Sequence, residues 1–126
     1  MADATSSQSS GARGRGRVGA STDVAAIRLE FHGFLARRLE PLGRPHGSRV
    51  LVDVTATPGE TVGMLLTRLA AADARYELLY EPGNARLPEH VEAVLNDRVL
   101  DLQGGLAAAL RPGDVLSFLP AHAGGG

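Results

Sequence analysis

The chain contains no cysteine, no lysine and no tryptophan. Without cysteine it can form no disulfide, thiolate metal site or Cys-based nucleophile, so any sulfur that it handles must come from another molecule. Because lysine is absent, all 13 basic residues are arginine, a bias typical of GC-rich coding. With only three Phe and two Tyr in the sequence, aliphatic side chains must fill the core.

Net charge and long apolar runs are also lacking. The formal net charge of -1 does not indicate a polycation for nucleic acid or an acidic mimic. No apolar run approaches the roughly 20 residues that cross a bilayer, and the N-terminus lacks the apolar core of a secretory signal. We therefore expect a cytoplasmic protein that has no membrane partner.

The composition changes near residue 24 and again near the C-terminus. Residues 1–23 are mainly Ser, Gly, Ala, Thr and Arg, with Val18 as an isolated apolar side chain. Such a segment cannot bury enough apolar surface to offset the entropy of ordering it. The sequence therefore predicts a disordered arm over 1–23, one domain over 24–120 and a flexible glycine tail over 121–126.

Alternation of apolar and polar residues predicts several strands, because successive side chains of a strand point to opposite faces. The first two are expected to pair as a hairpin, and Asn96 and Asp97 form a tight turn that tolerates positive φ. In the last strand, Leu116 and Phe118 are expected to face the helix, with Leu119 on the opposite face. The predicted strands cover 27–31, 50–54, 91–95, 99–100 and 115–119.

One segment has the pattern of a main helix. Thr61 is predicted to be its N-cap, since the hydroxyl can accept a hydrogen bond from a free amide of the first turn. Apolar residues then line one helical face until about residue 72, and shorter helical pieces are expected near 34–42 and 76–80. The element order predicts an α+β, ubiquitin-like β-grasp fold: a mixed sheet of four to five strands packed on one main helix.

The end of the sequence resembles a known family. The hairpin at 96–99, the Gly113-Asp114 turn, the apolar last strand and the ending Leu119-Pro120-Ala121-His122-Ala123-Gly124-Gly125 are similar to the MoaD/ThiS sulfur carriers. This family includes the small subunit of molybdopterin synthase. The resemblance covers about residues 25–126, and the last fifteen or so are its specific part.

The resemblance implies a chemical role for the C-terminus. An adenylating partner that resembles ubiquitin-activating enzymes would use ATP on the terminal carboxylate. A sulfur donor protein would then convert it to a thiocarboxylate, for delivery to a biosynthetic enzyme such as the large subunit of molybdopterin synthase. Gly126 would carry the sulfur, or Gly125 if the last residue is trimmed, because the family's Gly-Gly falls on Gly124 and Gly125.

The residues themselves agree with this role. Consecutive glycines give a narrow lead that can enter another protein's active site, although three terminal glycines could also be frayed coil. Leu119, Pro120 and His122 are the expected partner contacts. The four histidines have no metal-ligand spacing, and no catalytic constellation is evident, so we expect a carrier that is not an enzyme and binds no metal or cofactor.

The destination of the sulfur and the class of function stay open at this stage. The insertion at 75–88 favours a molybdopterin-type or cysteine-type carrier over a thiamine-type one, with molybdopterin as the leading expectation. The stretch 104–125 also resembles carriers for cysteine biosynthesis. Two other classes are a ubiquitin-like protein modifier and a plain interaction or RNA-binding module. In the last, Arg13, Arg15 and Arg17 would contact nucleic acid, which is otherwise not an expected partner.

Overall fold

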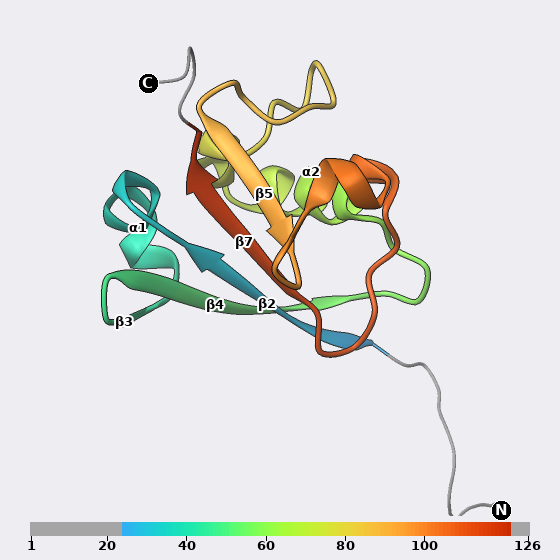
Figure 1. The fold of residues 1–126 in the computed structure, drawn as a ribbon, viewed down its shortest axis with the longest axis horizontal. Coiled ribbons are helices and arrows are strands. Elements are labelled where there is room, and N and C mark those ends of the chain that lie inside the picture. Colours follow the sequence, from blue (N-terminus) through green and yellow to red (C-terminus); the bar gives the residue numbers. More distant parts are fainter. Residues whose placement is uncertain (1–23, 122–126) are drawn as a thin grey trace, which may run out of the picture.

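The computed structural model describes residues 24–121, and these residues form one mixed sheet with helices packed on it (Figure 1). The order across the sheet is β3-β4-β2-β7-β5-β6. The central strands β2 and β7 run parallel, whereas all other neighbours are antiparallel. The strands are β2 Ala25–Phe31, β3 Arg44–His46, β4 Arg49–Ala56, β5 Val91–Leu95, β6 Arg98–Val99 and β7 Val115–Pro120.

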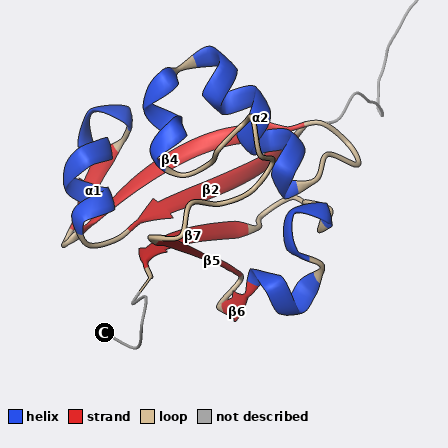
Figure 2. Cartoon of the chain, turned by 90° about the horizontal axis from the view of Figure 1, so that it is seen from above, coloured by secondary structure: helices blue, strands red, loops and turns tan. Residues whose placement is uncertain are grey.

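Two α-helices lie on the same side of the sheet, as Figure 2 shows: α1 (Phe34–Leu39) and the longer α2 (Val62–Ala72). The Thr61 hydroxyl accepts a hydrogen bond from the Met64 N–H at 3.2 Å, so the predicted N-cap is confirmed. Short 3₁₀ turns cover Glu40–Leu42, Ala74–Leu78, Leu100–Gln103 and Gly105–Ala107. Among residues 24–121, no helix is long and apolar enough to cross a membrane.

The core lies between the helices and the inner face of the sheet. Leu116 and Phe118 of β7 are fully buried there, as the alternation predicts, and Leu65 of α2 is a fully buried member of the same core cluster. Burying each side chain of this size contributes about 1.5 to 3 kcal/mol. These contacts place β7, the strand that leads into the tail, at the centre of the packed structure.

The β-grasp prediction is confirmed, but the sheet has six strands rather than four to five. The additional strand is β3, which pairs with β4. Its sequence contains Pro45 between Gly43 and Gly47, so it has the composition of a loop. Proline is tolerated in a strand at the edge of a sheet, because the edge leaves one side of the backbone unpaired.

Candidate functional site at the root of the tail

The chain reaches its C-terminal tail through β7, which is held on both sides. On one side the parallel register with β2 extends to Phe31 opposite Phe118. On the other side the antiparallel register with β5 extends further, to Val91 opposite Pro120. The tail therefore begins at a point that the sheet fixes in space.

Gly33 and Pro120 make a close contact at this point. Gly33 is at φ +61°, and a Cβ atom there would lie 2.7 Å from Cγ and 3.2 Å from Cδ of Pro120. Next to it, the His32 N–H donates a hydrogen bond to the Phe118 carbonyl at 3.0 Å. The junction between β2 and α1 thus packs directly against the last residue of β7.

His90 holds the chain from the opposite side. Its backbone carbonyl accepts a hydrogen bond from the Ala121 N–H at 2.8 Å. The His90 ring packs against Phe34, with ring centroids 5.8 Å apart and planes inclined at 42°. Because Phe34 is the first residue of α1, this pair links the approach to β5 with the element that carries Gly33.

The predicted partner contacts differ in their positions. Leu119 lies on the outer face of the sheet and is half-buried, whereas Pro120 alternates to the other face and packs on Gly33. His122, Gly124, Gly125 and Gly126 lie outside the described residues, as do residues 1–23 of the predicted arm. The structure thus places the root of the tail and one neighbouring apolar contact.

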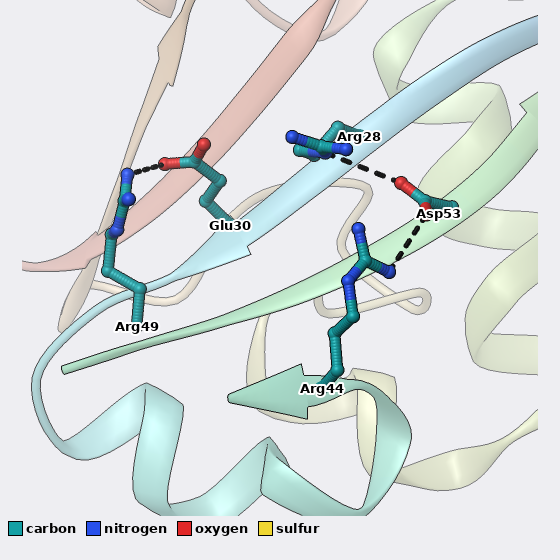
Figure 3. Close-up of polar contacts among 5 residues, drawn as sticks. All are labelled: Arg28, Glu30, Arg44, Arg49 and Asp53. Atoms are coloured by element: carbon teal, nitrogen blue, oxygen red, sulfur yellow. Dashed lines mark hydrogen bonds and ion pairs between the residues drawn. The ribbon is translucent and has the colours of Figure 1, made fainter. Parts of the chain in front are cut away.

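Ion pairs occupy the half of the outer face that β2, β3 and β4 form (Figure 3). Asp53 accepts from Arg44 at 2.8 Å and from Arg28 at 3.4 Å, and Glu30 accepts from Arg49 at 3.0 Å. The hydrogen bond from Arg44 holds the pKa of the Asp53 carboxyl below its ordinary value. The two pairs of Asp53 are exposed, so each contributes at most about 1 kcal/mol, whereas Glu30 is mostly covered. The charged side chains on this half of the face are therefore paired with one another.

The other half of the outer face carries more apolar side chains. Val94 of β5 and Val115 and Leu119 of β7 are half-buried there, with Ser117 between the last two, and the exposed Glu92 of β5 lies opposite Leu119. We call Val94, Val115, Ser117 and Leu119 the apolar strip. It runs along β7 toward Pro120, the last residue of that strand.

A cleft lies beside Ala121, between β5, β6 and the loop that precedes β5. Leu87, Val99 and Leu106 contribute apolar walls. Carboxylates of Glu89, Glu92 and Asp101 also line it, together with Arg86, which is paired with Glu81 at 2.9 Å. The surface on this side of the tail root is therefore acidic.

Within residues 24–121, no three His, Asp or Glu side chains lie close enough together to hold a metal ion. The histidine nearest to a carboxylate at the root is His32, whose Nε2 lies 3.5 Å from Oε1 of Glu30. The described residues fix the point where the chain leaves β7, and the apolar strip lies next to the acidic cleft there, because Glu92 of the cleft pairs with Leu119 of the strip.

The fold and the site define a ubiquitin-like carrier or modifier, and comparisons with known proteins agree. The family model described as "ThiS family" matches residues 49–125, so the chain belongs to the ThiS family. The sulfur carrier protein CysO of Mycobacterium tuberculosis, and likewise that of Mycobacterium bovis, is 35% identical over 85 residues, which cover 65% of this chain and 88% of the relative. The resemblance to the MoaD/ThiS carriers is confirmed.

Solved structures agree on the fold. The Haloferax volcanii HVO 2177 protein has a TM-score of 0.58 at 26% identity and covers 88% of this chain and 99% of its own. Small archaeal modifier protein 1 of the same organism has a TM-score of 0.54 at 24% identity, with 76% and 97% covered. Urm1 of Trypanosoma brucei has a TM-score of 0.57 at 18% identity, with 82% and 99% covered. The last two are evidence of a shared fold alone.

Sequence reasoning missed Gly33, Phe34 and His90 as parts of the site. The alternation in 27–31 does predict where β2 ends, so a glycine two residues after that end indicates a turn. No local pattern, however, indicates that this glycine packs on Pro120, because the two residues are far apart in the sequence. The contact exists only after β2 and β7 have paired.

Proposed function

We propose that this protein is a sulfur carrier whose terminal carboxylate becomes a thiocarboxylate, on Gly126 or on Gly125 if the last residue is trimmed. The observation that supports it most is the position of β7. A central strand carries the chain to a fixed point at Ala121, and the sequence then continues for five residues that end in three glycines. Glycine has no side chain, so this lead can follow a narrow channel into another protein.

The chemistry takes place on partners. An oxygen of the terminal carboxylate attacks the α-phosphorus of ATP bound to an adenylating enzyme of the ubiquitin-activating type, and pyrophosphate leaves. A sulfur nucleophile at the oxidation level of sulfide, supplied by a donor protein, then attacks the carbonyl carbon of the acyl adenylate. The bond to AMP breaks and a thiocarboxylate remains. The chain itself supplies the carboxylate and its presentation, and ATP binds to the partner.

The apolar strip is the proposed docking surface for these partners. Leu119 is its member closest to the tail, and an apolar side chain at the centre of an interface contributes more than charged groups at its rim. His122 follows directly after the fixed root and would enter the partner's channel with the glycines. Pro120 contributes by fixing the root, since its ring packs on Gly33.

We propose cysteine biosynthesis as the destination of the sulfur. The 35% identity to sulfur carrier protein CysO supports it. It agrees with the resemblance of residues 104–125 to carriers for cysteine biosynthesis that the sequence indicated. The molybdopterin destination, which the sequence put first, stays a prediction. The large subunit of molybdopterin synthase is therefore the natural alternative acceptor in a test.

The test is an intact-mass measurement. The chain is incubated with ATP, a sulfide source and the adenylating enzyme encoded in the same genome, and we expect one oxygen to be exchanged for one sulfur. The thiocarboxylate is then offered to a cysteine synthase homologue and, separately, to a molybdopterin synthase large subunit. We expect the first to consume it. A mass that stays unchanged under all these conditions would contradict the sulfur-carrier proposal.

Protein modification is distinguished by denaturing blots of the tagged chain in its own cells. A modifier gives covalent ladders on target proteins, whereas a carrier for small molecules gives a single band. Because the sequence has no lysine, a ladder cannot consist of copies of this chain joined through their own lysine side chains. Ladders would therefore report true targets and would favour the modifier function.

A further inference from the structure

We propose that Gly33 is a positioning residue for the C-terminal tail: its contact with Pro120 fixes the direction in which the chain leaves β7. Gly33 lies far from the tail in the sequence, near the start of the described residues, so the motif at the C-terminus does not include it. That Gly33 fixes the direction of the chain at Pro120 is argued from the geometry alone. The consequence for sulfur transfer rests on the function proposed above.

Two independent features require glycine at this position. With φ +61° and ψ -137°, the Gly33 backbone lies in a region that is strained for residues with a side chain. In addition, a Cβ atom would lie 2.7 Å from Cγ of Pro120, which is closer than carbon atoms approach without displacement. The proline ring therefore packs directly on the backbone of the junction between β2 and α1.

The opposite side of the root is also held. The Ala121 N–H donates to the His90 carbonyl at 2.8 Å, and the His90 ring packs on Phe34. Pro120 and Ala121 thus lie between two segments that contact each other through Phe34 and His90. We call Gly33, Phe34, His90, Pro120 and Ala121 the seat of the tail.

The seat affects transfer because it sets the direction in which the tail begins. The five residues 122–126 span at most about 17 Å, so a tilt at the root shifts the volume that the terminal carboxylate can reach. A carboxylate that spreads over a larger volume has a lower effective concentration in the partner's active site. The folded domain should still dock on the adenylating enzyme through the apolar strip. We therefore expect disruption of the seat to lower kcat for activation rather than to raise KM.

The test uses Gly33→Ala, Pro120→Ala and the double variant. The first readout is hydrogen exchange at the Ala121 amide, and the second is kcat and KM for ATP-dependent activation by the adenylating enzyme. We expect faster exchange at Ala121 and a fall in kcat of about 5- to 30-fold in each single variant, the factor that corresponds to freeing one backbone residue. The kcat of the double variant should fall no further than that of the single variants, since both substitutions disrupt the same contact.

The matched control is Gly59→Ala. Gly59 is at φ +80°, with no atom within 4 Å of an added Cβ, so it carries the backbone strain without the clash. It precedes α2 in the turn after β4, beyond the pair Ala25–Ala56 at the opposite end of β2. We expect a small loss of stability and no change at Ala121 or in kcat.

If Gly33→Ala fails to fold, Pro120→Ala still tests the contact between Gly33 and Pro120, because it removes the proline ring without straining the backbone. Unchanged Ala121 exchange in Pro120→Ala would overturn the proposal, and so would unchanged kcat where the wild-type chain is activated. Additive losses in the double variant would also overturn it. If the wild-type chain is never activated, the sulfur-carrier function fails, and the exchange measurement alone then supports or overturns the seat.

Discussion

The side-chain amide of Asn96 donates a hydrogen bond to Oδ1 of Asp114 at 2.9 Å, which joins the turn between β5 and β6 to the turn that precedes β7. The Asn96 side-chain oxygen accepts from the Val115 N–H at 2.9 Å, and Oδ2 of Asp114 accepts from the Arg111 N–H at 2.8 Å. The start of β7 is therefore fixed by polar side chains, as its end is fixed by the seat.

Replacing Asp114 with alanine should lower the free energy of unfolding by about 1 to 3 kcal/mol, because its buried carboxylate joins two turns through hydrogen bonds. Asn96→Ala should cost an amount at the lower end of this range, because Asn96 is exposed. Urea denaturation of the two variants measures this loss. Asn96→Ala has the added cost of φ 53°, which asparagine tolerates better than alanine does. The control is Asp97→Gly in the same turn, at φ 69°, which should stay within about 0.5 kcal/mol of wild type. An equal loss in the control would show that any change in this turn destabilises the protein and that the hydrogen bonds of Asn96 and Asp114 have no special contribution.

Glu60 forms a buried ion pair that should make stability depend on pH. Its carboxylate accepts from Nε of Arg68 at 3.1 Å and from Nη2 at 2.9 Å, and the Thr57 N–H donates to it at 3.0 Å. The hydrogen bonds from Arg68 hold the pKa of Glu60 below its ordinary value of 4.5. Because the folded pKa is below the unfolded one, the stabilisation is complete above the unfolded pKa and is lost as the pH falls through the folded pKa.

Glu60→Gln should therefore flatten the acid limb of stability below pH 4.5, which thermal melts across pH 2 to 7 would show. Arg68→Ala should cost about 1 to 3 kcal/mol at neutral pH, at the lower end because the guanidinium is half exposed. Hydrogen bonds from Arg75 lower the pKa of Asp73 to about 2, from an ordinary value of 3.8. Protonation of Asp73 should therefore still lower the stability of Glu60→Gln, by a smaller amount, as the pH falls from 3.8 toward 2. An acid limb that Glu60→Gln leaves unaltered would contradict the assignment.

The N-cap and the core face of α2 should differ in their contributions. Thr61→Ala removes the acceptor for the Met64 N–H and should cost about 1 kcal/mol, the usual value of an N-cap. Leu65→Ala empties a fully buried position and should cost roughly 2 to 5 kcal/mol. Chemical denaturation compares them, with the exposed Met64→Ala as the control on the same helix. Similar small losses of stability in Thr61→Ala and Leu65→Ala would contradict the roles assigned to Thr61 as the N-cap and to Leu65 as a core residue.

Local patterns predicted the elements that depend on neighbours in the sequence. Alternation around Leu116 and Phe118 indicated which face of β7 is buried, and Thr61 indicated the start of α2. The strand β3 was missed because Pro45 reads as a break, and only its position at the sheet edge makes it compatible with pairing. The contact of Gly33 with Pro120 was missed for a related reason, since it depends on tertiary pairing that no periodicity encodes.

The terminal glycines provide the most direct test of how the tail works. Deleting Gly125 and Gly126 shortens the lead by about 7 Å, so the new terminal carboxylate should no longer reach the nucleotide in the partner. The deletion lies beyond every described contact, and the melting temperature should stay unchanged while ATP-dependent activation is lost. Gly125→Val should also block activation, because a β-branched side chain widens the tail and restricts its backbone. Pyrophosphate release and intact mass measure both variants against wild type. Sulfur that appears on a chain without its last three glycines would show that another group accepts it, and the terminal carboxylate would then lose its proposed role.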